Sequence, residues 1–378
     1  MRVLMFWAAL AALNLAAGIF ISSQAHRMSD LENMMRWGHA WLVEGRNVYE
    51  IDGWAVAYPP NGVVALSPLG LLPIGIVHPT WMLLNIMMAI VAPYCAARFF
   101  RPHESLRVIA LPVLMFLCWG GVRTLTQFSL ITLVLSMASM MLADRSRVMS
   151  GACLGLALMK PQVAIPVFLW SVFTRRWTLV LTAVLVAGGL FAVFCVRADA
   201  HPIRVVGRYA EILAAYHTGD AILAGISEFR PLIYQLITDV SKVDAIASSI
   251  ALGLLAGICA TGFQEGAVRK RVLYAAPPLV ACWSLMTFYH LTYGFVTLLP
   301  VMMLLALNDT RRSTLRQVLF WILQLGMMFD IPGLSRRAGL AETGLYVNAL
   351  AHADRVLMVV LFAGLVALAW REEPEGSR

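Results

Sequence analysis

The chain has 378 residues, of which 60% are hydrophobic and only 13% charged, and its net charge is +8. Soluble domains contain about 25% charged residues, so the composition excludes a water-soluble globular protein. Apolar stretches of about 16–22 residues recur, and about 20 helical residues cross a bilayer with every backbone group paired inside the helix. The composition therefore predicts an all-α polytopic membrane protein.

In chain order, the apolar stretches predict about twelve transmembrane helices. The first, 3–21, resembles a secretory signal, but it lacks a small-x-small cleavage site, so we expect a permanent helix. The others are 74–97, 108–122, 126–143, 148–159, 161–174, 178–196, 243–263, 272–288, 293–307, 315–330 and 355–370. We expect residues 1–378 to form a single integral membrane domain. Its outer loops, near 23–73, 197–242 and 331–354, contain apolar and aromatic residues at helical spacing, which predicts interfacial helices.

Basic residues indicate the orientation of the chain. When the N-terminus is placed inside, more than half of the Lys and Arg residues fall at the termini or in short turns on the cytoplasmic side. They are Arg2, Arg98, Arg101, Arg107, Arg145, Arg147, Arg175, Arg176, Arg269, Lys270, Arg271, Arg311, Arg312, Arg316, Arg371 and Arg378. We therefore expect a bacterial inner membrane protein with both termini in the cytoplasm. Contact with anionic lipids of the inner leaflet explains the positive charge without a nucleic-acid partner.

Glycine spacing gives a weak indication of how the helices pack. Gly151 and Gly155, and likewise Gly253 and Gly257, have the G-x-x-x-G spacing that permits close helix contact. No internal repeat is obvious, which counts mildly against a transporter built from inverted halves.

The sequence gives little indication of metal or redox chemistry. All six cysteines lie in or beside apolar stretches without C-x-x-C spacing, so we expect neither a disulfide framework nor a thiolate metal site. Asp30, Glu32 and His26 lack the spacing of metal ligands. We therefore expect metal-independent activity and no cofactor.

The stretches 148–159 and 161–174 are short for transmembrane helices. At about 1.5 Å per residue each reaches some 18 Å, which places the turn between them, at Lys160, below the outer surface. A buried ammonium is costly, so one interpretation is that Lys160 extends outward or pairs with a carboxylate. The other is that Lys160 faces a cavity and holds an anion, with Pro161 turning the chain.

The first outer loop carries a carboxylate followed by rigid turns. Asp30 precedes an apolar-periodic stretch, so it can cap a helix by accepting hydrogen bonds from the first N–H groups. Tyr49 and then Tyr58, Pro59 and Pro60 follow it, and proline restricts both its own backbone and that of its predecessor. A loop of fixed shape with one carboxylate can instead hold a general base, which is the second interpretation of Asp30.

Four segments carry distinctive residues in order along the chain. They are the first outer loop with Asp30, Tyr49 and Tyr58-Pro59-Pro60; Thr126-Gln127-Phe128-Ser129; Met159-Lys160-Pro161-Gln162 followed by Arg175-Arg176-Trp177; and Ser284 to His290 with Leu299-Pro300. Together they resemble glycosyltransferase family 87, the polyprenyl-phosphate-mannose-dependent mannosyltransferases of the membrane-embedded GT-C class. The similarity extends over most of the chain, although each motif alone is weak.

The resemblance implies a GT-C-like fold and a hexosyltransferase at the outer face of the membrane. The donor would be a polyprenyl-phosphate sugar, with mannose as the family default, and the acceptor a hydroxyl of a lipid-linked or cell-envelope glycan. Asp30 corresponds to the family's catalytic base. The candidates for binding the substrate or the donor phosphate are Lys160, His290, Arg123, Arg230, Gln127 and Tyr58.

The chain also departs from the family pattern. Thr126 and Ser129 replace an expected Gly and Asn, and His290 stands alone where relatives often have two histidines. These changes concern the choice of sugar or acceptor more than the reaction class. His290 can also be an ordinary interfacial residue. A polytopic transporter or flippase of a lipid or glycan remains the alternative function, since its composition would be similar.

Overall fold

The computed structural model describes residues 2–23, 29–119, 127–216, 228, 230–234, 236–237, 239–262, 267–288, 292–307, 313–329, 331–332, 335, 338–340, 343 and 350–371. Within these residues every regular element is a helix. The α-helices are α1 (Arg2–Ser23), α2 (Ser29–Leu42), α3 (Pro60–Leu66), α4 (Ile74–Phe100), α5 (Leu106–Leu117), α7 (Ser129–Leu142), α8 (Arg147–Ala157), α9 (Pro161–Phe173), α10 (Trp177–Arg197), α11 (Pro202–Tyr216), α12 (Arg230–Tyr234), α13 (Val240–Gly262), α14 (Ala267–Thr287), α15 (Leu299–Leu307), α16 (Thr314–Phe329) and α19 (Ala353–Arg371). The 3-10 helices are η1 (Val48–Glu50), η2 (Ser67–Leu71), η4 (Thr292–Leu298) and η5 (Leu350–His352).

Each apolar stretch predicted from the sequence coincides with a helix. The helices that are long and apolar enough to cross a membrane number five among the described residues: Arg2–Phe20, Ile74–Phe100, Trp177–Arg197, Ser241–Ala260 and Leu350–Trp370. Most of the remaining apolar helices, α8 and α9 among them, are shorter than 18 residues. The prediction of an all-helical membrane protein is confirmed for the described residues, whereas the count of about twelve spans stays a prediction.

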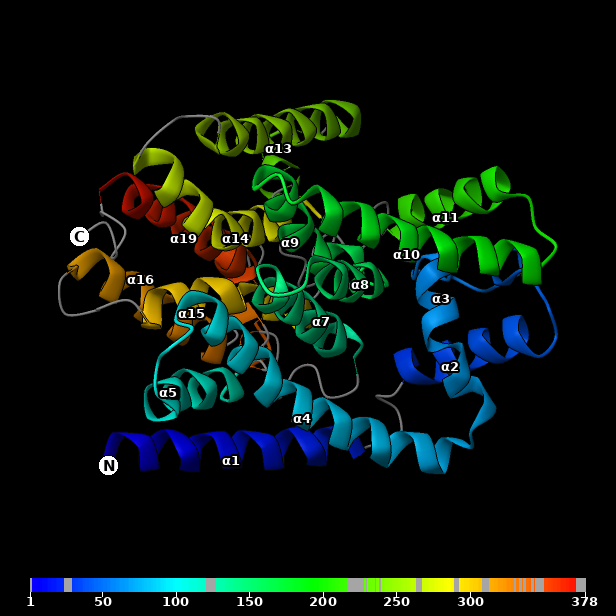
Figure 1. Ribbon diagram of the computed structural model, residues 1–378, viewed down its shortest axis with the longest axis horizontal. Helices are drawn as coiled ribbons and strands as arrows, with labels where there is room; N and C mark the ends of the chain where they lie inside the picture. The colour runs from blue at the N-terminus through cyan, green and yellow to red at the C-terminus, as the bar shows by residue number, and fades with distance from the viewer. Residues whose placement is uncertain are drawn as a thin grey trace.

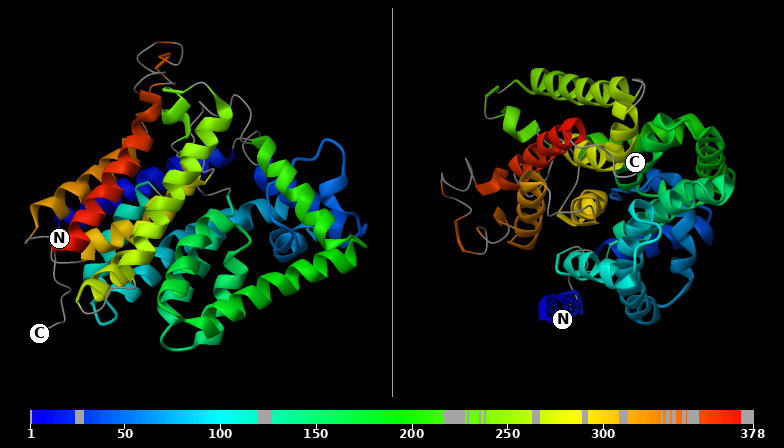
Figure 2. Two further views of the ribbon diagram at one scale, coloured as in Figure 1. Left: turned by 90° about the horizontal axis from the view of Figure 1, so that it is seen from above. Right: turned by 60° about the vertical axis from the view of Figure 1, so that its left-hand side comes forward.

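The buried side chains form two separate hydrophobic cores. The larger lies among the apolar helices, chiefly α4, α5, α7, α9, α14, α15 and α19. The smaller joins α2, η1, α3 and the beginning of α4 to the last turn of α10, and it includes Phe128 and Met159. Figure 1 shows α2, α3 and α11 grouped at one end of the molecule, away from α13, α16 and α19, and Figure 2 shows the same separation. The segment from α2 to the beginning of α4 therefore packs as an apolar unit onto one end of the helix bundle.

Close packing of α8 against α10 depends on two glycines. A Cβ atom on Gly151 would lie 2.6 Å from the Leu179 carbonyl oxygen, and one on Gly155 would lie 2.7 Å from the Ala183 carbonyl oxygen. The contact predicted from this G-x-x-x-G pair is confirmed. The second pair, Gly253 and Gly257, faces open space in the described part of the structure, since no atom would lie within 4 Å of an added Cβ. The same spacing therefore gives a helix contact only where another helix is adjacent.

Proline begins two of the helices that shape the outer loop and the hairpin. Pro60 is the first residue of α3 and Pro161 the first of α9. The first helical position suits proline because its fixed backbone angle is helical and the N–H that it lacks would have no partner within the helix. The expectation that all six cysteines lack disulfide partners is also confirmed, because each of them is free.

Candidate active site

The turn between α8 and α9 forms the centre of the candidate site. The two helices have 11 and 13 residues, so they are about 16 and 20 Å long, and the predicted short hairpin is confirmed. Lys160 is the residue before Pro161 and is 3% exposed. Its side chain does not extend outward to solvent, so this part of the first interpretation is wrong, whereas the pairing with a carboxylate stays a prediction. The hairpin holds a cation inside the protein.

The described contacts of the Lys160 ammonium come from two other motif segments. Lys160 Nζ donates a hydrogen bond of 2.8 Å to Ser129 Oγ at the first residue of α7, where the hydroxyl is fully buried. Lys160 Nζ also lies 5.6 Å from the centre of the Tyr58 ring, within the range of a cation–π contact. Asp30, in the first turn of α2, is close enough to attract the ammonium electrostatically. Residues from three of the four motif segments thus meet around one charge.

Tyr58 is held in place by the outer loop. Its backbone carbonyl accepts a hydrogen bond of 2.6 Å from the Tyr49 hydroxyl, and its ring packs against Phe128 with centroids 5.5 Å apart. Burial raises the pKa of the Tyr49 hydroxyl well above its ordinary value, so this group stays a neutral donor. The rigid loop predicted from its prolines therefore carries Tyr58 to the hairpin.

The backbone of α3 lies very close to the backbone of the hairpin turn. A Cβ atom on Gly62, in the first turn of α3, would lie 2.8 Å from the Met159 carbonyl oxygen. Glycine is thus the residue that lets α3 lie directly on the turn that precedes Lys160. A side chain at this position would push the Tyr58-Pro59-Pro60 turn away from the ammonium.

The fourth motif segment reaches the same turn from the other side. Ser284, fully buried on α14, donates a hydrogen bond of 2.8 Å to the backbone carbonyl of Gln162. This carbonyl belongs to the first turn of α9, two residues after Lys160. The segment from Ser284 to His290 was singled out by its resemblance to the family, and its first residue is in contact with the hairpin.

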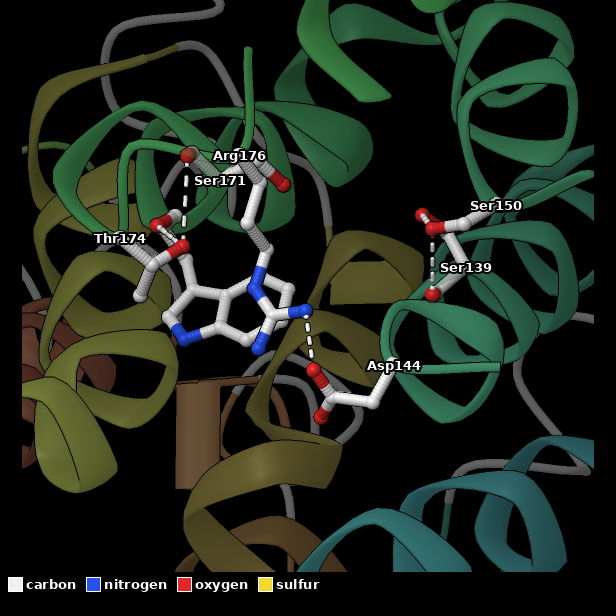
Figure 3. Close-up of polar contacts among 7 residues, drawn as sticks. Ser139, Asp144, Ser150, Ser171, Thr174 and Arg176 are labelled. Carbon is white, nitrogen blue, oxygen red and sulfur yellow. Dashed lines mark hydrogen bonds and ion pairs between the residues drawn. The ribbon is translucent and has the colours of Figure 1, made fainter. Parts of the chain in front are cut away.

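An ion pair and a cation–π contact stabilise the opposite end of the hairpin. Arg176 donates a hydrogen bond of 2.7 Å from Nη1 to Asp144 Oδ1, and its guanidinium lies 4.9 Å from the centre of the Trp170 ring. Figure 3 shows Arg176 extending to Asp144, with the Ser139–Ser150 hydroxyl pair joining α7 to α8 nearby. These contacts fix α8 and α9 relative to α7, and hence Lys160 relative to Ser129.

The carboxylates of α2 differ in their surroundings. Asp30 is half-buried, whereas Glu32 is exposed two residues further along the same helix. Residues two apart do not share a helix face, so Glu32 cannot act beside Asp30. Asp30 is therefore the carboxylate of α2 that is oriented toward the buried cation.

Arg230 belongs to a different cluster. Its Nε atom lies 3.5 Å from Asp244 Oδ1 and 4.0 Å from Glu228 Oε2. Among the residues that the structure describes, Arg230 forms its ion pairs with these carboxylates and not with the Lys160 turn. His290 and Arg123 lie outside the described residues, so their roles stay predictions.

The sequence gave no reason to choose Ser129 as a partner of Lys160. It stood out only as a departure from the family pattern, because a serine in an apolar helix usually bonds to its own backbone. A small polar residue directly after Gln127-Phe128, in a segment that resembles the family, was the available signal. Only the packing of α7 against α9 identifies the ammonium as its partner.

Comparison with known families supports the resemblance found in the sequence motifs. Residues 56–222 match the sequence model of glycosyltransferase family 87. The match includes Tyr58, Gln127 and Lys160 and begins after Asp30. No curated protein and no solved structure matches the chain. The apolar helices indicate a membrane protein. The resemblance to family 87 is confirmed over residues 56–222, and this family indicates a glycosyltransferase.

Proposed function

We propose that this protein transfers a hexose, with mannose as the sugar that the family implies, from a polyprenyl-phosphate donor to an acceptor hydroxyl of a lipid-linked or cell-envelope glycan. The observation that carries the proposal is the meeting of Asp30, Tyr58 and Ser129 around the buried ammonium of Lys160. These residues come from three of the four motif segments. A sugar transfer from a lipid phosphate requires a base and a cation in one place, and this arrangement supplies both.

Asp30 is the proposed general base. It removes the proton of the acceptor hydroxyl while the hydroxyl oxygen attacks the anomeric carbon of the donor sugar. The bond between the anomeric carbon and the phosphate oxygen breaks, and its electron pair leaves with the polyprenyl phosphate. A positioned base of this kind contributes about 10²–10⁴-fold to the rate.

Lys160 is the proposed stabiliser of the leaving phosphate. Negative charge develops on the phosphate as the glycosidic bond breaks, and a cation in a water-poor site stabilises that charge more than it stabilises the ground state. Ser129 and Tyr58 hold the ammonium without neutralising it, since one is a hydroxyl and the other a ring face. Arg123, His290 and Arg230 stay alternative phosphate or substrate contacts.

The reaction is placed at the outer face of a bacterial inner membrane, where nucleotide sugars are absent and lipid-linked donors replace them. Both termini are then cytoplasmic. Single cysteines introduced at Asn47 or Gly333 of a cysteine-free variant should react with a membrane-impermeant thiol reagent added outside, while cysteines at Ser146 or Ser313 should not. The reverse pattern would invert the proposed orientation.

The experiment that tests the function uses the purified protein with a radiolabelled polyprenyl-phosphate mannose and a membrane extract as the source of acceptor. We expect label to move to the acceptor and free polyprenyl phosphate to accumulate. Movement of the intact donor across a vesicle membrane without cleavage would instead support the flippase alternative. Testing other polyprenyl-phosphate hexoses in the same assay would identify the preferred sugar.

A further inference from the structure

Three buried polar groups near the Lys160 turn have no hydrogen-bond partner among the described residues. They are the side-chain nitrogen of Asn61, the indole nitrogen of Trp81 and the side-chain oxygen of Gln127. Asn61 is 8% and Trp81 4% exposed, so neither side chain reaches solvent to any extent. A buried polar group without a partner is destabilising, and these three belong to segments that meet at the Lys160 turn. Their grouping therefore points to a ligand.

These groups surround the contacts that hold Lys160. Asn61 stands between the Pro59-Pro60 turn and Gly62, whose backbone faces the Met159 carbonyl. Trp81 packs on Phe128 with ring centroids 4.7 Å apart, and Phe128 packs in turn on Tyr58, whose ring faces the ammonium. Gln127 is the residue before Phe128 and two before Ser129. The polar groups thus come from α3, from α4 and from the segment that begins α7.

The chemistry of the three groups distinguishes between ligands. Asn61 and Trp81 present N–H donors, whereas Gln127 presents an oxygen that only accepts. The phosphate diester of the donor accepts hydrogen bonds and has no proton for the Gln127 oxygen. A sugar hydroxyl both donates and accepts, so it can satisfy either kind of group. An aromatic ring beside such groups also offers a flat apolar surface for a pyranose.

We propose that Asn61, Trp81 and Gln127 form the subsite that binds the hydroxyl groups of the transferred sugar, next to the phosphate site at Lys160. The subsite rests on the proposed function, because it presupposes a sugar on the lipid phosphate. Gln127 then contacts the sugar and not the phosphate. When the donor is bound, its sugar hydroxyls supply the hydrogen-bond partners that these three groups otherwise lack.

The test compares two lipids that differ only in the sugar: polyprenyl-phosphate mannose and sugar-free polyprenyl phosphate. Asn61→Leu and Gln127→Met remove the polar groups at similar side-chain size. Each should weaken binding of the mannosylated lipid by about 3- to 10-fold, as expected for one hydrogen bond, and change binding of polyprenyl phosphate by less than about twofold. Lys160→Met should weaken both lipids. Asn14→Leu, in α1, is the matched control, since Asn14 bonds to the Leu10 carbonyl far from the hairpin in sequence.

Melting temperatures establish that each variant is folded, and Gln127→Met tests the subsite by itself where Asn61→Leu does not fold. Suppose that the wild-type protein turns over the donor. A variant that then binds both lipids equally more weakly, or binds both as tightly as wild type, would overturn the subsite and leave the proposed function standing. A wild-type protein that cleaves no polyprenyl-phosphate hexose would overturn the proposed function and the subsite together.

Discussion

Two cations are buried among the residues that the structure describes, and their surroundings differ. The described partners of Lys160 are the Ser129 hydroxyl and the face of the Tyr58 ring, which are both neutral, and Asp30 attracts it electrostatically. Arg355, 1% exposed at the start of α19, donates hydrogen bonds of 3.1 Å to the backbone carbonyls of Glu228 and Ala351. The Glu228 side chain is itself buried beside this guanidinium. The described hydrogen-bond and ring contacts of Lys160 are thus with neutral groups, with Asp30 acting electrostatically, whereas Arg355 lies beside the buried carboxylate of Glu228.

The second cluster contains several opposite charges close together. The cluster around Arg355 also contains Arg230, which is paired with Glu228 and Asp244. Burial raises the pKa of the Glu228 carboxyl above its ordinary value, although Arg230 and Arg355 act against this rise. Opposite charges there compensate each other, as in a structural ion-pair network. The described surroundings of Lys160 contain one carboxylate, Asp30, on a different helix.

The largest expected effect is on turnover in Asp30→Asn. The amide keeps the size of the side chain and cannot accept the acceptor proton, so turnover should fall by about 10²-fold or more while the protein still inserts and purifies. The measurement is the initial rate of transfer from labelled polyprenyl-phosphate mannose. Glu32→Gln is the matched control, because this exposed carboxylate lies on another face of α2, and its rate should stay near wild type. Near-normal turnover in Asp30→Asn would exclude Asp30 as the base.

Arg355→Met should chiefly reduce stability. The substitution removes hydrogen bonds to two carbonyls and leaves the buried Glu228 with less positive charge nearby, a change that costs about 3–5 kcal/mol in comparable buried pairs. The expected result is a lower yield and a lower melting temperature in detergent. If Arg355→Met kept the wild-type melting temperature but lost donor binding, Arg355 would have a role in donor binding and not in stability.

Lys160→Met should chiefly reduce donor binding or turnover. Methionine retains the apolar stem and removes the charge, so the loss should correspond to about 2–4 kcal/mol of phosphate stabilisation. We expect the melting temperature to change little, because the substitution removes a buried charge rather than leaving one without compensation. Donor affinity that is unchanged in the folded fraction, together with a lowered melting temperature, would assign Lys160 a structural role.

Arg230→Gln should have the smallest effect. Arg230 is about a quarter exposed in its side chain and already paired with carboxylates, and partly exposed ion pairs contribute roughly 0–1 kcal/mol. Donor turnover should therefore change by less than about threefold, measured in the same assay as Lys160→Met. A loss as large as that of Lys160→Met would place Arg230 on the donor phosphate and extend the active site to the second cluster.

Much of the architecture could be predicted from the sequence. Apolar composition and helical periodicity depend on local residue order, so they identified the helical stretches, including the short α8–α9 hairpin. Proline at the beginning of α3 and α9 was equally a local signal. By contrast, the two G-x-x-x-G pairs were indistinguishable in sequence, and only the position of α10 beside α8 separates them.

The candidate site was predictable in its residues but not in its contacts. Its motifs, with Asp30, Tyr58 and Lys160, followed from their resemblance to a family and from the cost of burying a charge. Whether Lys160 extended outward or turned inward depended on the packing of α7 and α3 around the hairpin, which no periodicity encodes. The hydrogen bond to Ser129 crosses 31 residues of sequence, and that from Ser284 to Gln162 crosses 122. Local sequence therefore determined which segments are helical and which residues carry charge. The tertiary structure alone decided which groups surround each charge, because these contacts depend on distances between segments far apart in the chain.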